Sequence, residues 1–119
     1  MDNEFKIVYT QNALDNLQAV MDYISINSPE AAYQVRQRIL KRAKSLQLFP
    51  NAGKSAATLG CFYEPDLRYI AEGRYYIFYK VMKGEVAIHH IIHSARDVGA
   101  LLMEFDFRYS DDPKDENDY

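Results

Sequence analysis

The sequence predicts an α+β domain in which an N-terminal strand and a two-helix hairpin precede a three-stranded antiparallel meander, all forming one sheet. Two observations support this prediction. Apolar residues recur at helical spacing over residues 11–47, and they alternate or cluster in short runs over residues 67–93. With 119 residues, the chain is long enough to bury one core and too short for two.

The first two elements are a strand and a helix. Phe5, Ile7 and Tyr9 alternate with other residues, which is typical of a strand, and we expect this strand to join the sheet. Thr10 can cap the helix that follows. Over residues 11–27, one helical face is apolar and consists of Leu14, Leu17, Val20, Met21 and Ile24.

A second helix begins after Ser28. Ser28-Pro29-Glu30 combines a hydroxyl that accepts amide hydrogen bonds, a proline at the first helical position and an acid near the positive end of the helix dipole. The Phe-Pro-Asn-Ala-Gly sequence at 49–53 ends this helix. We expect the two helices to pack as a hairpin on one face of the sheet.

The exposed face of the second helix is basic. Such a face is either simply solvated or binds nucleic acid or an acidic partner. Residues 31–47 contain no acid, and with Lys54 of the following loop their cations are the candidate residues for nucleic-acid or partner binding. These cations are Arg36, Arg38, Lys41, Arg42 and Lys44.

The second half of the domain reads as a loop and a meander. Residues 54–64 mix Gly, Ser, Ala and Thr without a clear period, which predicts a loop. Tight turns at Glu72-Gly73 and Lys83-Gly84 separate apolar and aromatic runs. The three predicted strands span residues 67–71, 74–81 and 86–93.

The C-terminal end differs in charge from the rest. Residues 1–102 hold 12 Lys/Arg and 10 Asp/Glu, a net charge of +2, whereas residues 103–119 hold 2 and 7, a net charge of −5. We therefore divide the chain into a domain, 1–102, whose last turn Asp97 can cap, and an acidic tail, 103–119. Alternating aromatic residues at 104–109 predict an extra edge strand or a self-association segment, and the acidic end would screen the basic face.

Several classes of protein are disfavoured. The first six residues lack the apolar stretch of a signal peptide and no run is long enough to span a membrane, so we expect a cytoplasmic protein without a membrane partner. Cys61 is the single cysteine and is interpreted as an apolar filler. On a strand, His89 and His93 would lie roughly 13 Å apart while His90 faces the other way. We therefore predict no metal and no cofactor.

Seven short motifs follow one another along residues 5–102. In this order they resemble the RelE/ParE superfamily, toxins of bacterial type II toxin–antitoxin systems that include plasmid stabilisation proteins; the tail has no counterpart. The resemblance implies a toxin that arrests growth unless a cognate antitoxin wraps it with its C-terminal segment. The motifs are Asn12–Leu17, Asp22–Ile24, Ser28–Ala32, Leu48–Gly53, Leu67-Arg68, Tyr75–Lys80 and Ile91–Asp97.

The resemblance implies two mechanisms of growth arrest. ParE-like proteins inhibit DNA gyrase and need no catalytic residue, whereas RelE-like proteins cut messenger RNA, commonly in the ribosome and without a metal. The fold alone does not choose between them. Ser28–Ala32 and the long hairpin look more ParE-like, so we favour gyrase as the target. A third interpretation, motivated by the tail, is a non-toxic relative that only forms complexes.

An RNA-cutting mechanism defines a set of candidate catalytic residues. Such cleavage needs a base for the ribose 2′-hydroxyl, an acid for the leaving oxygen, and cations for the phosphate charge. The set applies only if the chain is RelE-like and if these side chains converge at one end of the sheet. It comprises His93 as the base, Arg68, Arg74 and Arg96 around the phosphate, and Glu64 or Lys54 as helpers from the loop.

Each of these residues also has a structural interpretation. A cation at Arg96 would keep His93 neutral and available as a base, but His93 can equally hydrogen-bond the following turn. Arg96 can pair with Asp97, and Arg74 can stack on a neighbouring tyrosine. These alternatives stay open at the level of the sequence.

Overall fold

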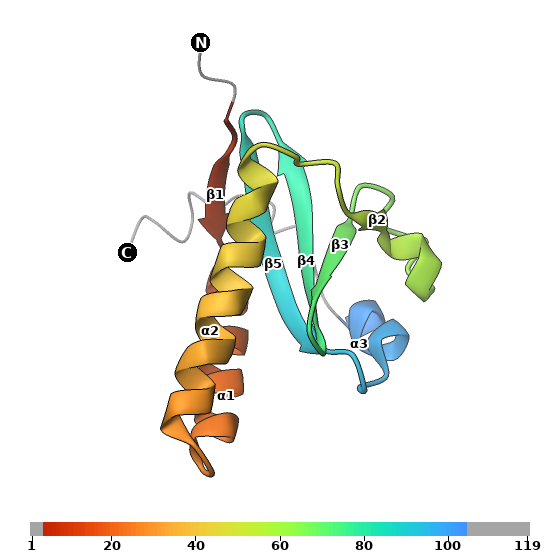
Figure 1. Ribbon diagram of the computed structural model, residues 1–119. Coiled ribbons are helices and arrows are strands. Elements are labelled where there is room, and N and C mark those ends of the chain that lie inside the picture. Colours follow the sequence, from red (N-terminus) through yellow and green to blue (C-terminus); the bar gives the residue numbers. More distant parts are fainter. Residues whose placement is uncertain (1–3, 105–119) are drawn as a thin grey trace.

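The computed structural model describes residues 4–104 of the chain (Figure 1). Residues 105–119 of the tail therefore lie outside the described residues, and so do residues 105–109 of the predicted extra strand. Glu104, the first residue of that predicted strand, is the last residue of a helix. Within the described part, no helix has both the length and the apolar character needed to cross a membrane. The elements are β1 (Lys6–Tyr9), α1 (Gln11–Ser25), α2 (Pro29–Lys44), η1 (Ser45–Gln47), β2 (Lys54–Ser55), η2 (Ala56–Leu59), β3 (Arg68–Glu72), β4 (Tyr75–Met82), β5 (Glu85–His93) and α3 (Val98–Glu104).

One mixed sheet of five strands forms the centre of the molecule, in the order β1-β5-β4-β3-β2. β3, β4 and β5 pair antiparallel in succession, whereas β1 joins the sheet parallel to β5. The α+β class is confirmed, but the sheet is larger than the predicted one. Its fifth strand, β2, lies in the stretch predicted as a loop, because two residues are too few to show an alternating period.

The helical hairpin covers one face of the sheet (Figure 1). Thr10 caps α1 and Ser28 caps α2, each accepting the backbone N–H three residues later. The buried stripe of α1 passes through Ala13 and Leu17, while Leu14, placed on the apolar face by its spacing, is 44% exposed. The stripe packs with α2 and the sheet into one core, which also includes Ile39, Ala43, Leu46, Ile77, Tyr79, Val86, Ile88 and Ile91.

The opposite face of the sheet is covered by η2, α3 and the segment between η2 and β3. Asp97 accepts a hydrogen bond from the backbone N–H of Ala100 (3.2 Å), so it caps the last helix as expected. That helix runs to Glu104 rather than ending at Leu102. Cys61 is buried here as a small apolar side chain, in a cluster with Ala56, Leu67, Phe78, Ile92, Val98 and Leu102.

A buried tyrosine holds the loop that follows the helical hairpin. The Tyr79 hydroxyl donates to the carbonyl of Pro50 (2.9 Å) and accepts from the N–H of Gly53 (2.9 Å). A Cβ at Gly53 would lie 2.5 Å from that hydroxyl and 2.6 Å from the carbonyl oxygen of Tyr69, so only glycine fits. The loop is therefore attached to the middle of the sheet.

Removing this hydroxyl should destabilise the fold. We expect Tyr79→Phe to lower the free energy of unfolding by about 1–3 kcal/mol, because the Gly53 N–H and the Pro50 carbonyl lose their buried partner. Urea unfolding followed by circular dichroism measures the loss. Tyr33→Phe, at a side chain that is 60% exposed, is the matched control, and equal stability of the two variants would contradict the assignment.

Beyond Ile88, Thr10 and the start of α1 replace β1 as the hydrogen-bonding neighbour of β5. β1 pairs with β5 only as far as Ile88, whose carbonyl accepts the N–H of Thr10 (3.0 Å). The Thr10 hydroxyl then donates to the carbonyl of His89 (3.2 Å), and the side-chain oxygen of Asn16 accepts the N–H of Ile91 (3.0 Å). Backbone groups of β5 that β1 does not reach are thus bonded by α1.

β5 contains a bulge at His89. Phe78 pairs with His90 and Tyr79 pairs with Ile88, so His89 is an extra residue of β5 that has no register partner on β4. Ile88 and Ile91 consequently share the hairpin-side core although they lie three positions apart, an odd spacing that regular alternation would place on opposite faces. The strict alternation that we assumed for the three histidines is therefore wrong across this point. In residues 4–104, no three His, Cys, Asp or Glu side chains come close enough to hold a metal ion.

Two buried histidines of β5 make the stability of the fold depend on pH. Burial lowers the pKa of His89 to about 4, assisted by the charge of Lys80. Burial also lowers the pKa of His90 to about 4, assisted by His89. Both values lie below the 6.5 of an unperturbed histidine, so the unfolded chain takes up protons first as the pH falls.

Stability should therefore fall on mild acidification. The contribution of the neutral histidines is present above about pH 6.5 and is lost progressively as the pH falls toward 4. Between about pH 7 and 5.5, we expect a loss of about 1 kcal/mol per histidine in denaturant unfolding. Carboxylates titrate mostly below that window, so a flat profile within it would rule out the assignment to these histidines.

Candidate functional site

The turn between β3 and β4 and the end of β5 meet at one end of the sheet. Tyr75 and His93 are register partners whose rings pack edge to face, with centroids 5.1 Å apart. Arg74 lies beside them, because its carbonyl accepts the N–H of Ser94 (2.7 Å). Burial raises the pKa of the Tyr75 hydroxyl, as does Tyr23, while Arg74 opposes the shift, so this phenol stays a hydrogen-bond donor.

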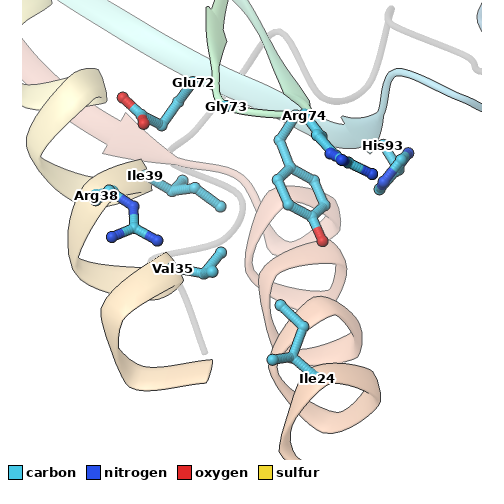
Figure 2. A pocket seen from close by; sticks show the side chains of 9 residues that line it. Ile24, Val35, Arg38, Ile39, Glu72, Gly73, Arg74 and His93 are labelled. Carbon is cyan, nitrogen blue, oxygen red and sulfur yellow. The ribbon is translucent and has the colours of Figure 1, made fainter. Parts of the chain in front are cut away.

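Two adjoining pockets lie between this end of the sheet and the helical hairpin, and both are lined by Tyr75 and His93. We call them together the sheet-end groove. The smaller pocket, of about 300 Å³, is drawn in Figure 2, with Arg38 on the α2 side and Arg74 beside His93 on the sheet side. The larger pocket, of about 530 Å³, is lined by Asn16, Ala19, Val20, Tyr23, Ile91, Ile92 and Arg96.

The His93 ring is held by the turn that follows it. Its Nδ1 atom accepts the backbone N–H of Ala95 (3.0 Å), and its carbonyl accepts the N–H of Arg96 (3.1 Å). An acceptor at Nδ1 requires that the neutral ring carries its proton on Nε2. In this arrangement, neither ring nitrogen offers a free lone pair, so His93 can donate a hydrogen bond but is poorly placed to act as a base.

Three of the six candidate catalytic residues lie away from the groove. Arg68 pairs with Tyr79, and Tyr79 lies five residues after Arg74 in the chain. The Arg68 guanidinium donates to the carbonyls of Gly53 (2.8 Å) and Asn51 (3.4 Å). Glu64 forms an ion pair with Lys80 (2.6 Å), and Lys54 sits on β2 at the sheet edge. The predicted convergence therefore holds for Arg74, His93 and Arg96 alone.

The cations of α2 do not form a single binding surface. Arg38 lines the sheet-end groove, and the Arg42 guanidinium donates to the carbonyl of Ala71 (3.2 Å) on the β3 side. Arg36 lies on the β1 side, where its charge opposes the burial that raises the pKa of Tyr9 to about 12. Lys44 lines a cavity on that same side, and Lys41 is exposed.

Sequence reasoning missed several residues of the groove. The sequence places Arg38 with the partner-binding cations rather than with Arg74 and Arg96, because only the fold shows that α2 faces the β3–β4 turn at that point. At the level of the sequence, Tyr75 is only part of the Tyr75–Lys80 motif and a neighbour on which Arg74 can stack. The apolar wall from Val20 and Tyr23 had a signal, since Val20 lies one helical turn after the buried Leu17 and Tyr23 lies one turn after Val20.

Comparisons with known proteins agree on the family. The family model described as ParE toxin of type II toxin-antitoxin system, parDE, matches residues 7–98. Toxin RelE2 of Caulobacter vibrioides is 37% identical over 92 residues, which cover 76% of this chain and 97% of that protein. A solved structure, described as the chromosomal ParDE TA system from P. aeruginosa, matches with a TM-score of 0.62 and 23% identity, covering 77% of this chain and 98% of that one. The chain therefore belongs to the RelE/ParE family of toxins of type II toxin–antitoxin systems.

The hydrogen bonds made by Nδ1 of His93 and by Nδ1 of His90 can be tested directly. We expect neutral His93 to carry its proton on Nε2, and neutral His90 to carry it on Nδ1, since the Asn16 side-chain oxygen 3.1 Å away can only accept. Long-range ¹H–¹⁵N NMR spectra at about neutral pH distinguish the two tautomers, so His90 serves as the internal comparison. A proton on Nδ1 of His93 would restore it as a candidate base.

Proposed function

We propose that this chain is a toxin that acts by binding, with DNA gyrase as its target, and that a cognate antitoxin neutralises it by covering the sheet-end groove. The chain's membership of the family described as ParE toxin supports this proposal. The antitoxin follows from the same family, whose toxins belong to two-component systems. The groove is a suitable binding surface for an antitoxin because it combines apolar walls with Arg38, Arg74 and Arg96.

The observation that carries the choice of mechanism is the state of His93. A ribonuclease without a metal needs a base beside the scissile phosphate, and among residues 4–104 His93 is the one histidine that lines the groove. Its Nδ1 is occupied by the N–H of Ala95. The candidate helper Glu64 pairs with Lys80, and Arg68, a candidate for binding the phosphate, donates to the carbonyl of Gly53. A protein that inhibits by binding requires none of these groups to be free.

A RelE-like messenger ribonuclease is the second candidate. It is favoured by one observation, that Arg74, His93 and Arg96 line adjoining pockets, as cations around a phosphate would. The relative named Toxin RelE2 is consistent with this alternative. In that mechanism, His93 would exchange its bond to Ala95 for one to the ribose hydroxyl.

The two mechanisms differ in their response to one substitution. His93→Asn places a side-chain oxygen near the position of Nδ1, so it can keep the bond to the Ala95 N–H while it removes Nε2. We expect the purified variant to inhibit the supercoiling of relaxed plasmid by gyrase within about threefold of the unchanged chain, a difference below 1 kcal/mol. Lys83→Gln, at the β4–β5 turn far from the groove, is the control for altered surface charge.

Induction of the chain alone in growing cells completes the test. Gyrase inhibition predicts growth arrest with altered plasmid supercoiling and intact messages, for both the unchanged chain and His93→Asn. Discrete new messenger ends, lost in His93→Asn while supercoiling stays normal, would establish the ribonuclease instead. Undisturbed growth, with the folded protein present, would identify a non-toxic relative.

A further inference from the structure

We propose that the sheet-end groove is a docking surface for the chain's own acidic C-terminal segment, residues 105–119, which competes there with external partners. The proposal concerns where this segment binds, and it holds whichever target the toxin has. It is argued from the lining of the groove, from the composition of the segment and from where the segment begins.

The groove presents two kinds of surface to a ligand. Its larger pocket is walled by apolar side chains of α1 and β5, among them Val20, Ile91 and Ile92, and Arg96 lies at its exposed side. The adjoining pocket adds Arg38 and Arg74, against a single acid, Glu72. A complementary ligand carries apolar or aromatic groups together with several negative charges.

The C-terminal segment has that composition. Phe105, Phe107 and Tyr109 stand at every second position, so an extended backbone would direct them to one side. Residues 105–119 hold six Asp/Glu and two Lys/Arg, a net charge of −4, opposite to the net charge of +2 on residues 1–102. Pairs of opposite charge at such a rim steer binding more than they strengthen it, and the aromatic groups supply the buried area.

The segment also begins close to the groove. α3 starts two residues after Arg96 and is seven residues long, so its end lies only about 10 Å further along the helix. Fifteen extended residues can reach roughly 50 Å, several times that length. Because the segment is covalently attached, its effective concentration at the groove is of the order of millimolar, which allows a weak contact to be populated.

The basic side chains of α2 are a less suitable surface for the same segment. Arg36 and Lys44 lie on the β1 side, whereas Arg42 lies on the β3 side and already donates to the carbonyl of Ala71. The groove, in contrast, places Arg74 and Arg96 of the sheet end together with Arg38 of α2 around two adjoining pockets with apolar walls. The segment also lies beyond residues 7–98, the part of the chain that the family model matches, so the contact would be a property of this chain.

A spin label on the segment locates its docking site in the full-length chain. Cys61 is 1% exposed, so a nitroxide attached to Ser110→Cys labels the segment selectively. We expect the label to broaden the backbone amide signals of Ala19, Tyr23 and Arg96 in ¹H–¹⁵N spectra and to leave those of Lys6 and Lys44 sharp. The broadening should be independent of protein concentration and should weaken as salt is raised toward 1 M, where the Debye length is about 3 Å.

Matched substitutions separate docking from accidental proximity. Arg96→Gln, or replacement of the six acids of the segment by Asn or Gln, should remove most of the broadening, whereas Lys83→Gln removes the same charge at the opposite end of the sheet and should not. Broadening centred on Lys6 and Lys44, broadening that grows with concentration, or no localised broadening would each overturn the proposal. None of these outcomes involves gyrase or growth, so the test fails or succeeds separately from the proposed function.

Docking of the segment has a measurable effect on partners. If the groove is free for only a fraction of the time, the apparent dissociation constant of any ligand of the groove rises by the inverse of that fraction. A peptide from the antitoxin, which we propose covers the groove, should therefore bind the charge-neutralised variant more tightly than the unchanged chain. Equal affinities would show that the segment does not obstruct the groove.

Discussion

The junction between β1 and α1 determines the shape of the molecule. β1 follows β5 only to Ile88, and Thr10 then turns the chain into α1 while its hydroxyl bonds the next carbonyl of β5. Asn16 continues the same edge by accepting the N–H of Ile91. Because a helix replaces a strand at this point, β5 has a helix beside its last residues, and the wall of the larger pocket follows from that replacement.

Much of the fold could be predicted because its information is local. Thr10 and Ser28 mark the helix starts through single hydrogen bonds, and the turns at Gly73 and Gly84 require positive φ angles that glycine adopts without strain. The larger sheet, the parallel pairing of β1 and the bulge at His89 depend on contacts between distant segments. A two-residue strand and a single extra residue leave no period in the sequence from which they could be inferred.

The candidate site shows the same division between local and distant information. Arg74, His93 and Arg96 meet because a tight turn and a strand end are register partners, which follows once the meander is assumed. Arg68 could have been excluded by the spacing argument used for the histidines, since it lies four residues before the end of β3 at Glu72, roughly 13 Å along the strand from the turn that carries Arg74. The contact between Nδ1 of His93 and the N–H of Ala95 required coordinates, because the conformation of the turn decides it.

The parallel pairing of β1 with β5 also has a consequence for synthesis of the protein. Lys6 pairs with Glu85, so the N-terminal strand has its partner only after some eighty further residues have been translated. Contacts of such separation slow folding, and at 5–20 residues per second a ribosome needs several seconds to supply them. Until then the edge of β1 is open and the wall of the groove on β5 is missing. The nascent chain therefore lacks a complete groove until β5 has been made, so a partner that covers the groove can bind there only late in synthesis.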